Sequence, residues 1–213
     1  MNLMLTALLQ TVYMVLASTL IAVVLGFPLA VILLFTRPGG LRPNEAVYTI
    51  VNTLVNVFRS FPFIILMIVL IPLGQALIGK STGTTATIIP LSIAAAPFVA
   101  RIIEQSLLEA DPGLVEAARS MGANPMQILF QVLLPETTPS LILGITTSVI
   151  NIIGYSAMAG AIGGGGLGDV AIRFGLYRRS QPEMLWGSVL LILLFVQLVQ
   201  WMGNFLSRKL NHA

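Results

Sequence analysis

Long apolar segments dominate this sequence and decide the class of protein that it can form. Residues 4–35 contain no charged side chain. About 20 predominantly apolar residues are enough for a helix to cross the hydrocarbon core of a bilayer, so this segment can span a membrane with a tilt. Only 9% of all residues are charged, against about 25% in soluble domains. The sequence therefore predicts an all-α, multi-pass protein embedded in the lipid bilayer.

About five segments have the length and polarity of transmembrane helices, and they form one domain, residues 1–213. The second segment is interrupted, because Arg59, Ser60, Phe61 and Pro62 separate two apolar stretches. We interpret Arg59 as an anchor at the inner interface, followed by a helix that begins at proline; the alternative is a hinge of the transport path. The predicted spans cover residues 8–36, 48–73, 86–108, 140–162 and 184–206.

The third and fourth predicted spans carry residues that need partners. Pro90 and Pro97 lie inside the third, where neighbouring helices must satisfy the freed carbonyls. Near its end, Arg101 and Glu104 share a helix face and are predicted to pair. The fourth span is rich in hydroxyl and amide side chains, which either pack helices together or line a watery path. The sequence leaves both readings open.

A glycine cluster follows the fourth span. Residues 163–168 contain five glycines in GGGGLG and cannot continue a stable helix, so they predict a flexible gate or a tight re-entrant turn. A polar stretch is expected from there to Glu183. The candidate pathway or gate residues are Arg59, Tyr155, Ser156, Met158, Gly163 and Gly166.

The loop over residues 109–139 lies between the third and fourth spans and is predicted to form two short helices outside the lipid. Asp111 and Pro112 are a helix start signal, and Gly122 is suited to the left-handed residue that ends a helix. Asn124 and Pro125 repeat the start signal. The second helix is predicted to run from Met126 to Leu134 and to stop at Pro135.

This loop resembles the signature loop of binding-protein-dependent ABC importer permeases. The resemblance rests on the spacing of Glu116-Ala117-Ala118, Gly122, Val132 and Leu134-Pro135. It implies a cytoplasmic coupling helix that docks on a separate ATPase. We read the two alanines as a flat face open to close approach, and Glu116 as an orienting charge. The implied coupling residues are Glu116, Ala117, Ala118, Arg119, Met121, Gly122, Asn124 and Pro125.

Further segments resemble the methionine-importer branch of these permeases: residues 56–66, 95–101, 121–128, 154–158 and the glycine-rich segment to Gly168. The resemblance implies a homodimeric permease in the bacterial inner membrane. It also implies a cytoplasmic ATPase dimer and a substrate-binding lipoprotein as partners, with methionine as the small-molecule substrate. The chain itself is then no enzyme and holds no cofactor, because ATP and Mg bind to the partner.

Orientation follows from the same loop. If the N-terminus is outside, a small excess of basic residues lies inside, and the C-terminus is cytoplasmic. Arg37, Arg42, Arg101, Arg119, Arg208 and Lys209 are then inside, and Lys80, Arg173, Arg178 and Arg179 are outside. Since a docking surface for an ATPase must face the cytoplasm, we adopt this orientation.

Several patterns point to functions that the sequence does not support. Gly74, Gly79, Lys80 and Ser81 match the phosphate-binding pattern GxxxxGKS, and Gly163 to Gly168 spell GxGxxG, but neither follows a predicted strand. The protein has no cysteine and one histidine, His212, so thiol catalysis and multi-histidine metal sites are excluded. Its basic residues are scattered beside apolar runs, which argues against nucleic acid as a partner.

Two alternatives to a methionine permease remain. One is a permease of the same class for another small solute. The other is a secondary transporter driven by an ion gradient, which would be expected to carry ionisable residues inside the membrane. The spans are nearly free of carboxylates, and that mechanism leaves the signature loop unexplained.

Overall fold

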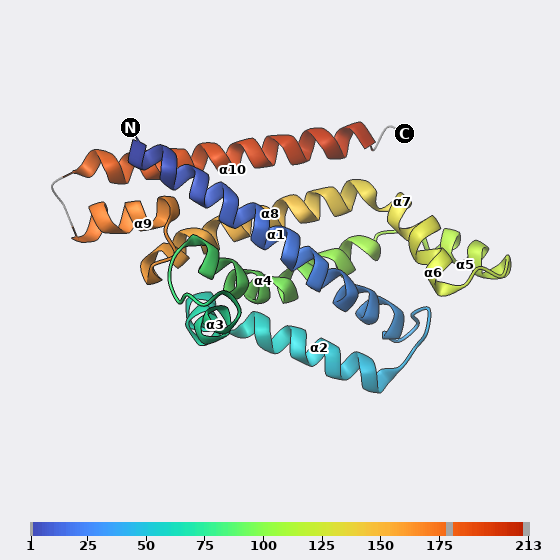
Figure 1. Cartoon of the computed structure of the whole chain (residues 1–213). Coiled ribbons are helices and arrows are strands. Elements are labelled where there is room, and N and C mark those ends of the chain that lie inside the picture. Colours follow the sequence, from blue (N-terminus) through green and yellow to red (C-terminus); the bar gives the residue numbers. More distant parts are fainter. Residues whose placement is uncertain (1, 178–180, 211–213) are drawn as a thin grey trace.

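The computed structural model describes residues 2–177 and 181–210, and every regular element in those ranges is helical (Figure 1). The predictions for Arg178, Arg179 and His212 lie outside the described residues. The α-helices are α1 (Asn2–Thr36), α2 (Glu45–Ser60), α3 (Phe63–Ile78), α4 (Thr84–Leu107), α5 (Pro112–Ser120), α6 (Pro125–Gln127), α7 (Leu134–Glu136), α8 (Thr138–Ala159), α9 (Gly166–Ile172) and α10 (Pro182–Leu210). Two π-helices, η1 (Ile128–Leu133) and η3 (Arg173–Tyr177), and the 3₁₀-helix η2 (Gly160–Ile162) continue them.

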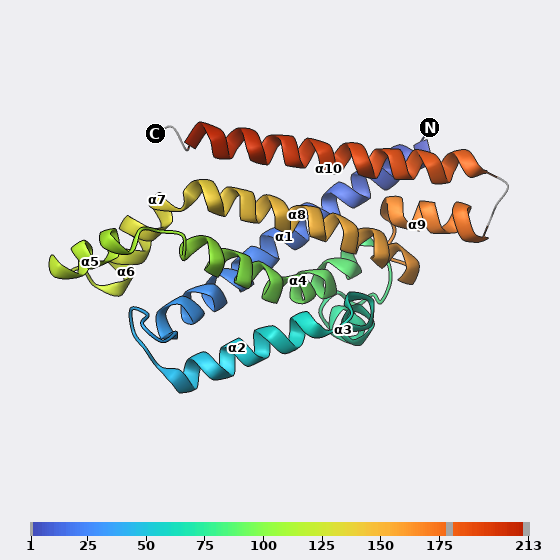
Figure 2. The ribbon, with the colours of Figure 1, turned by 180° about the vertical axis from the view of Figure 1, so that it is seen from behind.

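The long helices α1, α4, α8 and α10 are each long and apolar enough to cross a membrane. The pair α2–α3 passes the same test only as one broken span, which brings the possible crossings to five among the described residues. Figures 1 and 2 show α1 lying obliquely across α4 and α8, while α10 covers the outer side of α8. The prediction of an all-helical membrane protein with about five spans is confirmed at this level.

The second predicted span, residues 48–73, is bent by 107° between α2 and α3, at the interruption that the sequence predicts over residues 59–62. Phe61 is extended, with φ −70° and ψ 135°, because a residue before proline is disfavoured in the helical region. Pro62 then precedes the first turn of α3. As a result α3 runs across the direction of the other long helices and is seen end-on in Figure 1.

The core forms where small residues let helices approach closely. α1 packs most extensively on α4, and a methyl group on Gly26 would lie 3.0 Å from the backbone of Ala96 and Ala100. Such close contact is the usual basis of helix association in lipid. The cluster continues from this contact to α8 and to the loop between α4 and α8, with Ile152, Ile128 and Leu129 all buried.

The two ends of the molecule are built differently. Elements α5 to α7 lie at one end, together with the turn between α1 and α2 and the last turns of α10 (Figures 1 and 2). The N-terminus, α9 and the turn between α8 and α9 lie at the other end. The signature loop and the N-terminus are therefore at opposite ends.

Candidate functional site

The signature loop begins with the predicted helix start. The Asp111 side chain accepts a hydrogen bond of 2.8 Å from the backbone N–H of Gly113, and Pro112 occupies the first position of α5. This arrangement satisfies one of the free donors of the first turn, while proline needs none. The short helix α5 is thereby fixed in direction as the chain leaves α4.

Gly122 ends α5 as predicted. Its φ of +83° is left-handed, its N–H donates to Arg119 O at 2.9 Å, and the N–H of Ala123 donates to Ala118 O at 3.0 Å. This pair of bonds is the Schellman motif, which satisfies the last carbonyls of a helix and reverses the chain. The turn therefore depends on a residue that adopts positive φ without strain.

The second helix also starts as predicted but does not stop where predicted. Asn124 and Gln127 form a reciprocal capping box, with bonds of 2.8 and 2.9 Å. The helical path then continues as a π-helix, with Leu134 N–H donating to Leu129 O, and passes through Pro135 into α7. The prediction that the helix ends at Pro135 is wrong. The wider turn shifts the register, so that the proline lies in the first turn of α7, where a missing N–H costs little.

The two alanines of the signature have different surroundings. Ala118 is buried at 4% exposure in the core, whereas Ala117 is exposed. The expectation of a flat face made by both alanines is therefore wrong for Ala118, whose small side chain lets α5 pack on the core. Only Ala117 belongs to the free surface.

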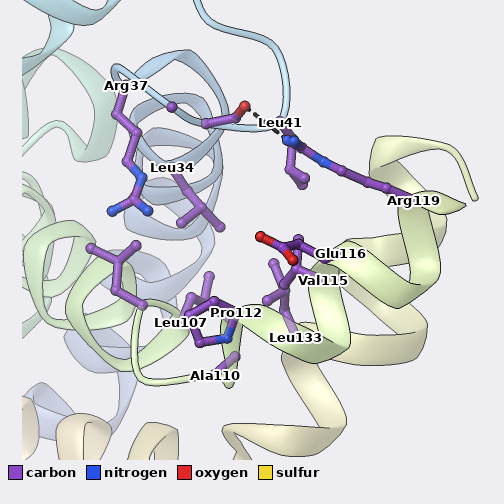
Figure 3. Close-up of a pocket in the computed structure, with 13 residues that line it drawn as sticks. Leu34, Arg37, Leu41, Leu107, Ala110, Pro112, Val115, Glu116, Arg119 and Leu133 are labelled. Carbon is purple, nitrogen blue, oxygen red and sulfur yellow. Dashed lines mark hydrogen bonds between the residues drawn. The ribbon is translucent and has the colours of Figure 1, made fainter.

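Arg119 connects α5 to the turn between α1 and α2. Its guanidinium donates a hydrogen bond of 2.9 Å to the carbonyl oxygen of Gly40 (Figure 3). Between these elements is a cavity of about 200 Å³, lined by Glu116 and Arg37 among others. Figure 3 shows the Glu116 carboxylate directed into this space between α5 and the Leu34–Leu41 region. Nothing in the sequence predicts the hydrogen bond from Arg119 to Gly40, because the two residues are 79 positions apart.

The outward surface of the loop is apolar at several places. Leu114 is 42% exposed, Met121 82%, Met126 56% and Phe130 56%. Clusters of large exposed apolar side chains beside polar ones are typical of protein-binding surfaces, and methionine adapts well to a partner. Of the predicted coupling residues, Met121 contributes a large exposed apolar side chain, whereas Asn124 and Gly122 fix the backbone.

The predicted pathway residues do not form one site. Arg59 and Tyr155 line the same hollow beside the α2–α3 break. The Ser156 side chain is buried and donates to Ile153 O at 2.7 Å, whereas Met158 is 51% exposed. Gly163 ends η2, in the turn that leads to α9, and α9 lies at the end of the molecule away from α5 to α7 (Figure 2).

The glycine segment forms an ordered re-entrant turn. Gly163, Gly165 and Gly166 all have positive φ. The N–H of Gly166 donates to the Gln10 side chain at 3.0 Å, and the N–H of Leu167 donates to Thr11 at 2.9 Å. The stretch after the glycines, for which the sequence predicted polarity but no helix, forms the helical segment α9–η3. That helix was missed because glycines head it, whereas side chains of α1 supply its cap.

The predicted pair of Arg101 and Glu104 is confirmed, with a distance of 2.6 Å between charged atoms. Arg101 also donates to the side chains of Asn52 at 2.6 Å and Asn56 at 3.1 Å. The group joins α2 to α4, and the Glu104 side chain is only 4% exposed. The two asparagines were not predicted as partners of Arg101, although their i, i+4 spacing in an apolar helix places them on one face.

The pattern that resembles a phosphate-binding loop lies in a different setting. Gly74 is inside α3, and Gly79 ends that helix with φ +77°. No strand precedes the pattern in the described part of the chain, so it lacks the strand–loop–helix setting that phosphate binding requires.

Comparison with known proteins gives consistent results. Residues 22–212 match the family model described as "Binding-protein-dependent transport system inner membrane component". The chain is 48% identical over 211 residues to the probable D-methionine transport system permease protein MetI of Vibrio cholerae, covering 99% of this chain and 93% of the relative. It is 47% identical over 151 residues to the D-methionine transport system permease protein MetI of Escherichia coli strain K12, covering 71% and 70%.

Solved structures agree with the sequence matches. The fold is similar to an inward-facing conformation of the MetNI methionine ABC transporter, with a TM-score of 0.96, 41% identity, and coverage of 99% of this chain and 97% of the other. An amino acid ABC transporter solved with histidines has a TM-score of 0.77 at 21% identity, covering 98% and 94%, and that similarity concerns the fold alone.

Proposed function

This chain belongs to the family of binding-protein-dependent transport system inner membrane components, and from that premise we propose that it is the membrane permease of an ATP-driven methionine importer. The chain forms the path across the membrane, and ATP is hydrolysed on a separate ATPase chain. A substrate-binding protein on the other side delivers the solute. The observation that carries the proposal is the signature loop, a capped helix pair that extends beyond the ends of the spans (Figure 1).

The loop has the properties that coupling to a motor needs. Its backbone is held by two caps and a Schellman turn, so that it can transmit force without unfolding. Met121, Met126 and Phe130 are available to a partner. On its inner side, Arg119 attaches it to the turn between α1 and α2, and the buried Ala118 attaches it to the core. Closure of an ATPase dimer would then move the spans as bodies and change which side the path opens to.

The finer points of the proposal are orientation and assembly. We place the loop, the turn between α1 and α2, and the C-terminus in the cytoplasm, and the N-terminus outside. Two copies form the path, because one chain carries one coupling loop and an ATPase dimer offers two docking grooves. Much of α2 and α3 is apolar and exposed in the single chain, including Leu54, Ile64 and Ile68, which supports their contact with lipid or a second copy. ATP and Mg are assigned to the ATPase, and the domain is one unit, residues 1–213.

The test is uptake of labelled methionine by proteoliposomes that contain this chain, its ATPase and its binding protein. We expect accumulation that requires ATP and persists when ion gradients are collapsed. ATP-driven uptake of another solute but not of methionine would refute the substrate and leave the class intact. Uptake that follows an ion gradient without ATP would refute the class.

Glu116 offers a more local test of the coupling loop. Glu116→Gln removes its charge and keeps its size, and we expect weaker association with the ATPase or lower coupled uptake with normal membrane insertion. Normal ATP-driven uptake by this variant would contradict its assignment to coupling.

A further inference from the structure

A hollow of about 140 Å³ lies beside the break between α2 and α3. Its wall is largely aromatic, with Phe58, Phe61 and Phe63 from the broken span, Phe98 from α4 and Tyr155 from α8, and Arg59 also lines it. A dry protein cavity of about 150 Å³ is enough to admit a benzene molecule, so this hollow has room for the side chain of a small solute.

Arg59 lies exposed in the last turn of α2, beside the break in the candidate span, and has no counter-charge in the described part of the chain. It has no ion-pair partner among the described residues, in which Arg101 pairs with Glu104 and Arg173 with Asp169. A charged group inside a span is costly and is normally paired or used for function. The planar guanidinium matches a carboxylate with two parallel hydrogen bonds. The guanidinium of Arg59 is therefore suited to bind a carboxylate of a solute in this hollow.

The rest of the wall suits an apolar group that is rich in polarisable atoms. The rings of Phe63 and Tyr155 are stacked, with centroids 3.9 Å apart and planes 8° from parallel, and both residues line the hollow. Thioether sulfur makes favourable contacts at the edges of aromatic rings. Among the residues that the structure describes, no carboxylate lines the hollow, so a cationic side chain would find no counter-charge there.

We propose that this hollow is a binding subsite for the amino acid during its passage, with Arg59 holding the α-carboxylate and the aromatic side chains holding the thioether chain. This inference rests on the proposed function, since it takes methionine as the solute, and adds a site in this chain where the solute is recognised. Binding there must be weak enough for release, because conduction requires a solute to leave as well as enter.

The experiment measures equilibrium binding to the purified complex of this chain with its ATPase, without the binding protein. The two probes are methionine and methioninamide, which keeps the side chain but lacks the carboxylate. For the unmodified complex we expect methionine to bind at least about tenfold more tightly than methioninamide, as is typical of hydrogen bonds to a charged group. In the Arg59→Gln variant, the affinity for methionine should fall by the same factor, so that methionine and methioninamide bind with equal affinity.

Measuring both probes with both proteins distinguishes a loss of carboxylate recognition from misfolding, because a misfolded variant loses affinity for both probes. The matched control is Arg42→Gln, the same change at an exposed arginine outside the hollow, which should keep the full preference for methionine. The inference is overturned if Arg59→Gln retains the preference, if it weakens both probes equally, or if the unmodified complex binds neither. ATP-driven methionine uptake by the unmodified importer is scored separately, so that the proposed function can stand while the subsite fails.

Discussion

Gly122 provides the sharpest test of how the coupling loop works. Replacing it with alanine adds a methyl group that meets no atom within 4 Å, so packing is unaffected. The cost comes from the backbone alone, because φ is +83° and a left-handed conformation costs an L-residue roughly 1–2 kcal/mol. That cost raises the population of a loosened turn by a factor of about 5 to 30.

The expected result of Gly122→Ala is a loss of ATPase affinity or coupled uptake of up to about 5- to 30-fold, with normal insertion into the membrane. Affinity is measured by titrating the detergent-solubilised permease with ATPase, and coupling by ATP-driven uptake in proteoliposomes. Gly122→Asn should lose less ATPase affinity and less coupled uptake than Gly122→Ala, because asparagine tolerates the left-handed region better than alanine.

Gly79 supplies a matched control at a different helix end. It also has positive φ, +77°, and a methyl group there also meets no atom within 4 Å. Gly79→Ala should therefore carry a similar strain in α3 but leave ATPase affinity unchanged. The reasoning is refuted if both variants reduce ATPase affinity equally, or if Gly122→Ala binds and couples normally.

Three further predictions concern the surface and the packing of the spans. Met121→Asp, at a side chain that is 82% exposed, should weaken ATPase binding and leave the thermal unfolding midpoint unchanged; a lowered midpoint would count against a role in docking. Arg101→Leu leaves Glu104 buried without its partner, which should lower the free energy of unfolding by about 3–5 kcal/mol. Adding Glu104→Gln should recover part of this loss, as measured by denaturation. Gly203→Ala places a methyl group 2.1 Å from Thr146 Oγ1 and should lower the thermal unfolding midpoint. Gly154→Ala has open space around it and should raise the midpoint slightly, because alanine favours helix. Equal shifts of the midpoint in the two variants would contradict the close packing of α8 and α10.

The apolar runs were sufficient to predict a helical membrane protein, because the length and polarity of a span are set by the bilayer and not by distant contacts. The caps at Asp111 and Asn124 and the turn at Gly122 were also predictable, since each depends on residues that are adjacent in sequence. Local signals decide local structure in these places.

The features that the sequence did not reveal depend on contacts between distant segments. The cap of α9 comes from Gln10 and Thr11, and the bond from Arg119 reaches Gly40. The π-turn before Pro135 reflects a choice of register that proline alone does not determine. The opposite surroundings of Ala117 and Ala118 became visible only once α5 was packed against the core.

The length of α1 has a mechanical consequence. Its 35 residues correspond to about 52 Å at the helical rise, which exceeds the hydrocarbon thickness and agrees with its oblique path (Figure 2). Side chains near its start hold α9, and the turn at its end accepts the hydrogen bond from Arg119. A single long helix thus connects the signature loop at one end of the molecule with α9 at the other. Each degree of rotation of this helix about one end would displace its other end by about 0.9 Å, so that a small tilt of α1 at one end of the molecule is felt at the other.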